Sequence, residues 1–400
     1  MSRQHTIQLT LFIVTFFTTT FSGMEWIYSR SLFTDFTWAA FLDGMKFSVP
    51  FLLILTSHEF GHYLAAKYHD IKVTLPYYIP QWFFGFLPAF GTMGAFIRIR
   101  EDITAQKKYF DIGIAGPLAG FLVAIGFIFY GFLSLPTQDH IFEIHPEYES
   151  LGENYEIIYD IDTFFLKKDI VNKERFNYGV LRDSIVYNTS FPSISLGNNL
   201  IFSWMKTFVV KDKSRIPNKH EMFHYPFLFA GYLALLFTAL NLLPIGQLDG
   251  GHIAYAMFGA KKTKLINQVV FIGLLLYAGL GAMSILLKEV LPESFGGFLL
   301  WFFAYLYTLS KCFYSMFENP RDRWMWAAIV VAAQFVLVLV FAWEGYMAWL
   351  LFCFIIGRYL GVYHPIVQNE KPLDGNRILL GYVALAILVL SLIPTPLVME

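Results

Sequence analysis

Two histidines and a glutamate in one pentapeptide are the residues of this chain best suited to chemistry. They belong to His58-Glu59-Phe60-Gly61-His62, an H-E-x-x-H pattern inside the stretch from Trp38 to Ala66, which is otherwise almost wholly apolar. On a helix, this spacing places two imidazoles on one face with a carboxylate beside them, as a hydrolytic zinc site requires. A pair of interfacial histidines at a helix end is the plainer alternative, but ionisable groups in an apolar helix are costly and indicate function. The pattern predicts that His58 and His62 bind zinc and that Glu59 is the catalytic base.

A catalytic zinc needs a third protein ligand, because such sites keep three protein ligands and one open position. We predict that this ligand is Asp249, within the sequence NLLPIGQLDGGH of residues 241 to 252. Pro244, Gly246 and Gly250 are expected to unwind a helix here. Non-helical backbone inside a membrane is tolerated only where it lines a protein or water cavity, and an acidic ligand belongs in such a cavity.

Other residues of the same types are interpreted as structural. A second Leu-Asp-Gly, at residues 373 to 375, lies in a polar loop and predicts an interfacial turn. Cys312 and Cys353 fall in apolar segments without the spacing of a disulfide framework or a metal site. Packing or interfacial roles are predicted for three further histidines: His69, His252 and His364.

The composition predicts an all-α polytopic membrane protein. The chain is 56% apolar and 19% aromatic but only 15% charged, well below the roughly one quarter charged of a soluble domain. The net charge of −1 and the lack of a basic run give no indication of nucleic-acid binding. The lipid bilayer is therefore the expected surroundings.

Nine apolar runs are long enough to cross a bilayer as helices, and the short eighth run is interrupted by Gly357 and Arg358. We therefore expect about eight or nine spans. The first is read as a retained helix, because no small-x-small cleavage site closes it. The runs cover residues 7 to 28, 38 to 66, 109 to 135, 223 to 243, 264 to 287, 297 to 317, 324 to 343, 345 to 361 and 377 to 394.

If all nine runs span the membrane, nearly all lysines and arginines of the short loops lie on one side of it. By the positive-inside rule, the N-terminus and the active-site end of the second helix are then cytoplasmic. The other side's short loops hold little beyond Arg30 and Lys288. The cationic side collects Arg3, Lys67, Lys72, Arg98, Arg100, Lys107, Lys108, Lys261, Lys262, Lys264, Arg321, Arg323, Lys371 and Arg377.

The connection between the second and third spans does not read as helix. Residues 95 to 100 alternate in polarity, and three prolines interrupt the preceding segment. A hairpin or re-entrant loop is predicted, with an interfacial aromatic loop as the alternative. In the third span, Gly116 and Gly120 are spaced for close helix packing.

The order of these features divides the chain into five predicted regions. An N-terminal span and connection (1–37) precede the first part of the catalytic core (38–135). A polar insertion (136–222), expected outside the cytoplasm, separates it from the second part (223–258), a broken helix with Leu-Asp-Gly. Accessory spans make up the remainder (259–400).

Together these motifs resemble the site-2 protease family of intramembrane zinc metalloproteases. The resemblance depends on H-E-x-x-H at His58 to His62 and on N-x-x-P followed by L-D-G at residues 241 to 250. It is supported by Gly91 to Ala95 and by Ala115 to Gly120. It covers residues 38 to 135 and 223 to 258, without a recognisable PDZ-like segment.

The resemblance implies a three-helix zinc-protease core, a small membrane-associated β-hairpin and cleavage of transmembrane substrates near the cytoplasmic face. It suggests that Asn241 stabilises the oxyanion or holds substrate. The expected reaction is hydrolysis of peptide bonds in single-span membrane proteins by a zinc-activated water, with Glu59 as base. Because a substrate helix must unwind first, the strand near Gly94 is predicted to pair with it.

Two other functions remain open at this point. One is a membrane zinc protease with an aqueous-facing site, whose third ligand is a glutamate such as Glu101 or Glu318. The other is a transporter or non-catalytic scaffold that keeps a metal site. The presence of Glu59 argues against the scaffold, because a structural zinc needs no base.

Overall fold

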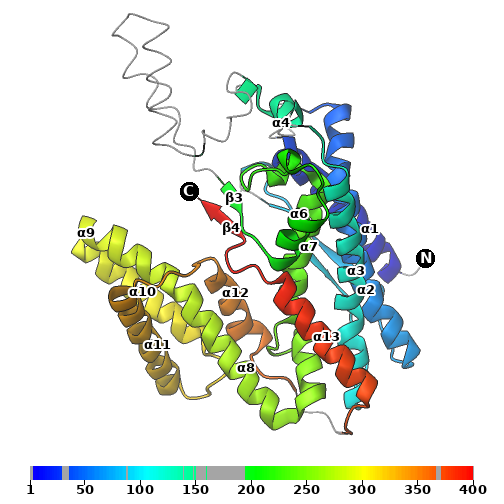
Figure 1. Ribbon diagram of the computed structural model, residues 1–400. Helices are drawn as coiled ribbons and strands as arrows, with labels where there is room; N and C mark the ends of the chain where they lie inside the picture. Colours follow the sequence, from blue (N-terminus) through cyan, green and yellow to red (C-terminus); the bar gives the residue numbers. More distant parts are fainter. Residues whose placement is uncertain are drawn as a thin grey trace, which may run out of the picture.

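The computed structural model describes residues 3–28, 36–86, 89–137, 139–146, 148–149, 159, 194–365 and 371–399. Much of the predicted polar insertion therefore lies outside the described residues. The remainder is mostly helical (Figure 1). The helices are α1 (Arg3–Tyr28), α2 (Trp38–Tyr68), α3 (Gln106–Leu133), α4 (Asp139–Ile144), α6 (Leu200–Phe208), α7 (Pro226–Leu242), α8 (Asp249–Ile285), α9 (Leu291–Glu293), α10 (Phe295–Cys312), α11 (Pro320–Phe341), α12 (Trp349–Ile355) and α13 (Gly375–Ser391).

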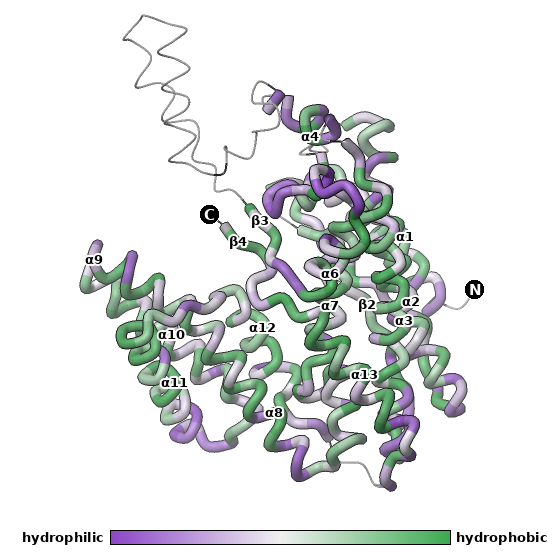
Figure 2. The backbone as a smooth tube through the Cα atoms, in the orientation of Figure 1, coloured by the Kyte–Doolittle hydropathy of each residue, from purple (hydrophilic) through white to green (hydrophobic). Residues whose placement is uncertain are grey.

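Within the described residues, five helices are long and apolar enough to cross a membrane: α1, α2, α3, α11 and α8 with its continuation to Glu293. Three shorter apolar helices cover residues 226–242, 349–360 and 375–391. Hydrophobic residues run along the helices, and hydrophilic residues gather near α4 and α6 and at the opposite ends of the helices (Figure 2). This pattern confirms an integral membrane protein with many apolar helices, while the predicted count of eight or nine spans stays a prediction.

The two largest hydrophobic cores of the described residues hold most of the helices. In the first, α2, α3 and α7 pack around buried aromatic and aliphatic side chains such as Phe47, Ile128 and Phe229. In the second, α8, α10, α11 and α12 pack around side chains such as Phe271 and Leu309. The predicted catalytic residues belong to helices of the first core and to the start of α8, which joins it to the second (Figure 1).

The connection between α2 and α3 is a two-stranded antiparallel sheet of β1 (Tyr77–Gln81) and β2 (Gly91–Phe96), as predicted. Helix α1 holds it through polar side chains, because unpaired strand groups need partners in an apolar setting. Thr18 Oγ1 donates to Gly91 O at 2.7 Å, and Trp26 Nε1 donates to Ala89 O at 2.8 Å. A second small sheet pairs β3 (Ile194–Leu196) with β4 (Leu397–Met399).

The predicted broken helix of residues 223–258 consists of two helices joined by a tight turn. Helix α7 ends at Leu242, and α8 begins at Asp249. Gly246 has a φ of +56°, and a Cβ there would overlap Gly361 O, so the turn requires glycine. Gly250 lies inside α8 rather than in the break, and α8 itself kinks at Gly259, where φ is +74°. Helix α8 consequently starts beside the catalytic core with Asp249 in its first turn.

Candidate metal centre

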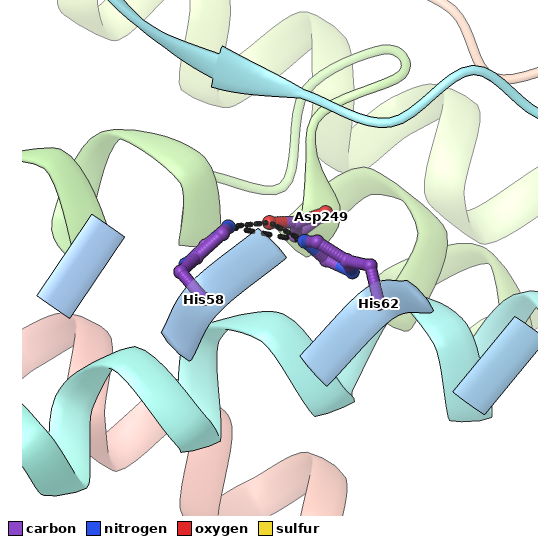
Figure 3. Close-up of side chains that lie close together, drawn as sticks. All are labelled: His58, His62 and Asp249. Atoms are coloured by element: carbon purple, nitrogen blue, oxygen red, sulfur yellow. Dashed lines mark hydrogen bonds and ion pairs between the residues drawn. The ribbon is translucent and has the colours of Figure 1, made fainter. Parts of the chain in front are cut away.

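Three predicted ligands converge in the first core and form what we call the helix cluster: His58, His62 and Asp249. The two histidines come from consecutive turns of α2, and Asp249 comes from the start of α8 (Figure 3). The two Nε2 atoms lie 3.0 Å apart, and each lies 3.4 Å from Asp249 Oδ2. The side chains are 8%, 9% and 15% exposed, so the cluster is almost closed to its surroundings.

These separations fit zinc. Ligand atoms at 2.0–2.2 Å from a tetrahedral zinc lie about 3.3 Å from one another, close to the separations of the cluster. Two imidazoles and one carboxylate are also a known donor set of hydrolytic zinc sites. The helix cluster can therefore hold the metal without rearrangement of its ligand atoms.

A backbone carbonyl fixes the orientation of one ligand. His62 Nδ1 lies 2.7 Å from Ile112 O on α3, and because a carbonyl only accepts, Nδ1 carries the proton. The Nε2 lone pair of His62 is then left to face Asp249 and the metal position. Such a hydrogen bond to the second ring nitrogen is the usual support of a metal-binding histidine.

Glycines on α3 allow this approach. A Cβ at Gly116 would overlap His62 Nε2, and a Cβ at Gly120 would lie 3.0 Å from His58 Cβ. In return, Gly61 of α2 packs against the backbone of Ala115. The predicted close packing at Gly116 and Gly120 is therefore confirmed, and the two glycines pack against His62 and His58.

Glu59 follows His58 on α2, is 5% exposed and lies near the backbone N–H of Ile97, just beyond β2. Tyr78 of β1 lies on the same side of α2, where its hydroxyl is 2.7 Å from Thr56 Oγ1. The acid is thus placed between the histidines and the hairpin. A peptide lying along the hairpin would pass this carboxylate.

Asn241 and Gly94, the two predicted substrate-side residues, lie in different surroundings. Asn241 Nδ2 is 3.4 Å from His58 Nε2, at the end of α7. Gly94 lies in β2 with a φ of +109°, and a Cβ there would meet no atom within 4 Å. Asn241 belongs beside the helix cluster, whereas Gly94 faces open space on the strand.

Two of the alternative third ligands, Asp374 and Glu101, are engaged elsewhere. Asp374, in the second Leu-Asp-Gly, caps α13 by accepting from Arg377 N at 3.1 Å, as its prediction as a turn implies. Glu101 Oε1 accepts from Lys72 N at 2.8 Å. Among the residues that the structure describes, the groups of His, Cys, Asp and Glu side chains that could hold a metal ion include neither Glu101 nor Glu318.

The three histidines assigned to packing have protein partners. His69 Nε2 lies 2.7 Å from Asp111 Oδ2, and His252 Nδ1 lies 2.7 Å from His364 Nε2.

The sequence reasoning did not identify Ile112, because a backbone carbonyl has no signature in side-chain types. It also passed over a second H-E-x-x-H, His220-Glu221-Met222-Phe223-His224, although the pattern is visible in the sequence.

The fold and the cluster define a class: a membrane protein with a metal site of two histidines and an aspartate between its helices. Residues 46–280 match the model of Peptidase family M50. The chain is 26% identical over 263 residues to "Probable zinc metalloprotease EGY2, chloroplastic" of Oryza sativa subsp. indica, covering 66% of this chain and 38% of that protein. It is 25% identical to "Probable zinc metalloprotease EGY1, chloroplastic" of Arabidopsis thaliana, covering 57% of this chain and 31% of that protein. No solved structure matches.

The chain therefore belongs to Peptidase family M50, since the match covers more than half of its length. This confirms the resemblance to the site-2 protease family, and the relatives are named as zinc metalloproteases, in agreement with the activity and cofactor expected from the sequence. The chain spans well under half the length of these relatives, at 38% and 31% of the two proteins. Their substrates and partners are accordingly not carried over.

Proposed function

We propose that this protein is an intramembrane zinc protease that hydrolyses peptide bonds in or near the transmembrane segment of single-span membrane proteins. The observation that carries the proposal is the convergence of His58, His62 and Asp249 at separations that suit zinc, with Glu59 beside them. A purely structural metal site in a scaffold needs no base, so the buried acid next to the ligands favours an enzyme over a scaffold.

The residues of the chain have distinct roles in this proposal. His58, His62 and Asp249 hold zinc, which when bound lowers the pKa of water and polarises the scissile carbonyl. Glu59 takes the proton of the attacking water on its carboxylate and delivers it to the leaving amine. Its position beside the helix cluster and next to the backbone of Ile97 supports this role.

Asn241 is proposed to donate from Nδ2 to the oxyanion, supported by its distance of 3.4 Å from His58 Nε2. Loss of one such donor typically lowers the rate by about 10²- to 10³-fold. Asn241→Ala is thus expected to slow cleavage by about that factor while zinc content stays unchanged. Lost zinc or an unchanged rate would instead assign Asn241 to packing.

Substrate binding is proposed to use strand β2 around Gly94, where a Cβ would meet no atom within 4 Å. A peptide bond in a helix is inaccessible, so the substrate must unwind and recover its hydrogen bonds by pairing with a strand. Helix-breaking residues in the substrate should then favour cleavage. Replacing them with Leu in a cleaved substrate should slow the reaction, and undiminished cleavage would exclude this step.

The helix cluster is proposed to lie towards the cytoplasmic side. The cationic residues that end α2 and begin α3 support this orientation, because Lys67, Lys107 and Lys108 lie at that end of the helices. A cysteine introduced at Lys107 should react with an impermeant thiol reagent only from the cytoplasmic side. Labelling from the opposite side would reverse the topology.

The deciding experiment compares Glu59→Gln with the wild type for bound zinc and for cleavage of co-expressed single-span proteins. Loss of a general base is expected to slow cleavage by about 10²- to 10⁴-fold. Zinc content should not change, because Glu59 is not a ligand. A variant that keeps zinc and cleaves at the wild-type rate would refute the protease assignment.

A further inference from the structure

A second group of metal-type side chains lies far from the helix cluster. It consists of His145, Glu221 and His224, which we call the turn cluster. Among the described residues, the helix cluster and the turn cluster are the two groups of three such side chains whose ligand atoms lie within 4.8 Å of one another. His145 follows α4, and Glu221 and His224 precede α7, so the turn cluster lies at the end of α7 opposite Asn241. The 17 residues of α7 separate the ends by about 25 Å.

Two of the three separations in the turn cluster are close to those of a metal site. His145 Nε2 lies 3.1 Å from His224 Nε2, and Glu221 Oε2 lies 3.3 Å from His224 Nε2 and 4.0 Å from His145 Nε2. Ligand atoms of a tetrahedral zinc are about 3.3 Å apart. A charge-assisted hydrogen bond between a histidine and a carboxylate would be shorter, at about 2.7–2.9 Å. The two contacts of His224 thus have the lengths found in the helix cluster rather than that of a simple ion pair, while Glu221 and His145 lie farther apart, at 4.0 Å.

A backbone hydrogen bond sets the tautomer of His224. Its Nδ1 lies 2.5 Å from Ile27 O at the end of α1, and since the carbonyl only accepts, Nδ1 carries the proton. In the neutral ring, the Nε2 lone pair then faces both His145 and Glu221. A cation at their centre would contact all three atoms. The same support, through Ile112 O, orients His62 in the helix cluster.

The local backbone explains which residues of this second pentapeptide converge. Residues 222–224 form a 3₁₀ turn, and His224 N donates to Glu221 O at 3.0 Å. Side chains three residues apart are eclipsed in a 3₁₀ turn, so Glu221 and His224 point the same way. His220 instead stacks on Tyr159, with ring centroids 4.1 Å apart and planes 8° apart.

We propose that His145, Glu221 and His224 bind a zinc ion that is separate from the catalytic zinc and fastens the two ends of the polar insertion to each other. Buried imidazole and carboxylate ligands favour zinc over calcium or magnesium, which prefer all-oxygen sites. Glu221 and His224 are each 1% exposed, and His145 is 22% exposed, so the ion is reached past His145. Glu221 is a ligand here, which leaves this pentapeptide without the base that Glu59 supplies in the other.

The test counts zinc per folded chain, by elemental analysis of detergent-purified protein equilibrated with low micromolar Zn²⁺. Wild type should carry two zinc ions, and the double variant His58→Ala/His62→Ala should carry one. Glu221→Ala and His224→Ala should also carry one each. His220→Ala is the matched control, because His220 belongs to the pentapeptide but not to the turn cluster, and it should keep both ions.

Two results would overturn the proposal. One is a His58→Ala/His62→Ala protein without zinc, a measurement that leaves the turn cluster intact and so does not depend on the folding of its variants. The other is loss of an ion in His220→Ala together with retention in His145→Ala, which would assign different ligands. Neither result bears on the protease proposal, whose test is the cleavage rate of Glu59→Gln.

Discussion

The chain contains the pentapeptide H-E-x-x-H twice, and the two copies differ in backbone rather than in residue type. On α2, the helix puts His58 and His62 on one face and leaves Glu59 beside them. Before α7, a 3₁₀ turn aligns Glu221 with His224 and directs the first histidine elsewhere. The comparison teaches that the helix, as much as the motif, decides which residues become ligands and whether a glutamate is left to act as base.

Both clusters take their third side chain from a distant part of the chain. Asp249 reaches the helix cluster from the start of α8, and His145 reaches the turn cluster from beyond α4. In each, one histidine donates its Nδ1 proton to a backbone carbonyl of a neighbouring helix. The two clusters are thus built alike. Variants that remove the metal of one cluster at a time, assayed for cleavage, should show whether the clusters share a function.

The largest expected effect is a difference in cleavage rate between Asp249→Ala and Glu221→Ala, although each variant should lose one zinc ion. Asp249→Ala should lose the catalytic zinc and slow cleavage at least about 10³-fold, because the Lewis-acid contribution is several kcal/mol. Glu221→Ala should lose the other zinc and still cleave. Zinc content and cleavage of a co-expressed substrate are measured on the same preparations, and cleavage lost equally in both variants would contradict the separation of roles.

The sequence was most informative where an apolar background made ionisable residues conspicuous. His58, Glu59, His62 and Asp249 could be chosen because charged groups are costly in an apolar helix, and the structure brings the three proposed ligands together. The paired strands between α2 and α3 were likewise predictable from prolines and alternation.

Other features could not be reached from residue types alone. The carbonyl of Ile112 has no side-chain signature, and the contact of Gly116 with His62 depends on how two helices cross. The pentapeptide at residues 220–224 stands in a polar context, where histidine and glutamate are ordinary surface residues, so its convergence with His145 needs the tertiary fold.

The close packing of α3 on the helix cluster gives a second, smaller effect. Gly116→Ala puts a Cβ against His62 Nε2 and must displace the ring. A displacement of about 1 Å in a catalytic constellation costs about 10²-fold in rate. Gly126→Ala on the same helix is the control, because its Cβ would meet no atom within 4 Å. Cleavage should fall only in Gly116→Ala, while zinc in the turn cluster stays; equal rates in both variants would show that the ring has room to move.

The smallest expected effect is on thermal stability, and it distinguishes a structural zinc ion from a catalytic one. In His58→Ala/His62→Ala protein, added zinc can stabilise the fold only through the turn cluster. Binding to the folded state alone contributes about 2.7 kcal/mol when free zinc is 100-fold above its Kd, which for a chain of 400 residues corresponds to a rise in Tm of about 3 °C. Introducing Glu221→Ala into this protein should abolish the rise, whereas His220→Ala should preserve it. A Tm that does not respond to zinc would mean that the turn cluster does not fasten the insertion, whatever its three side chains otherwise do.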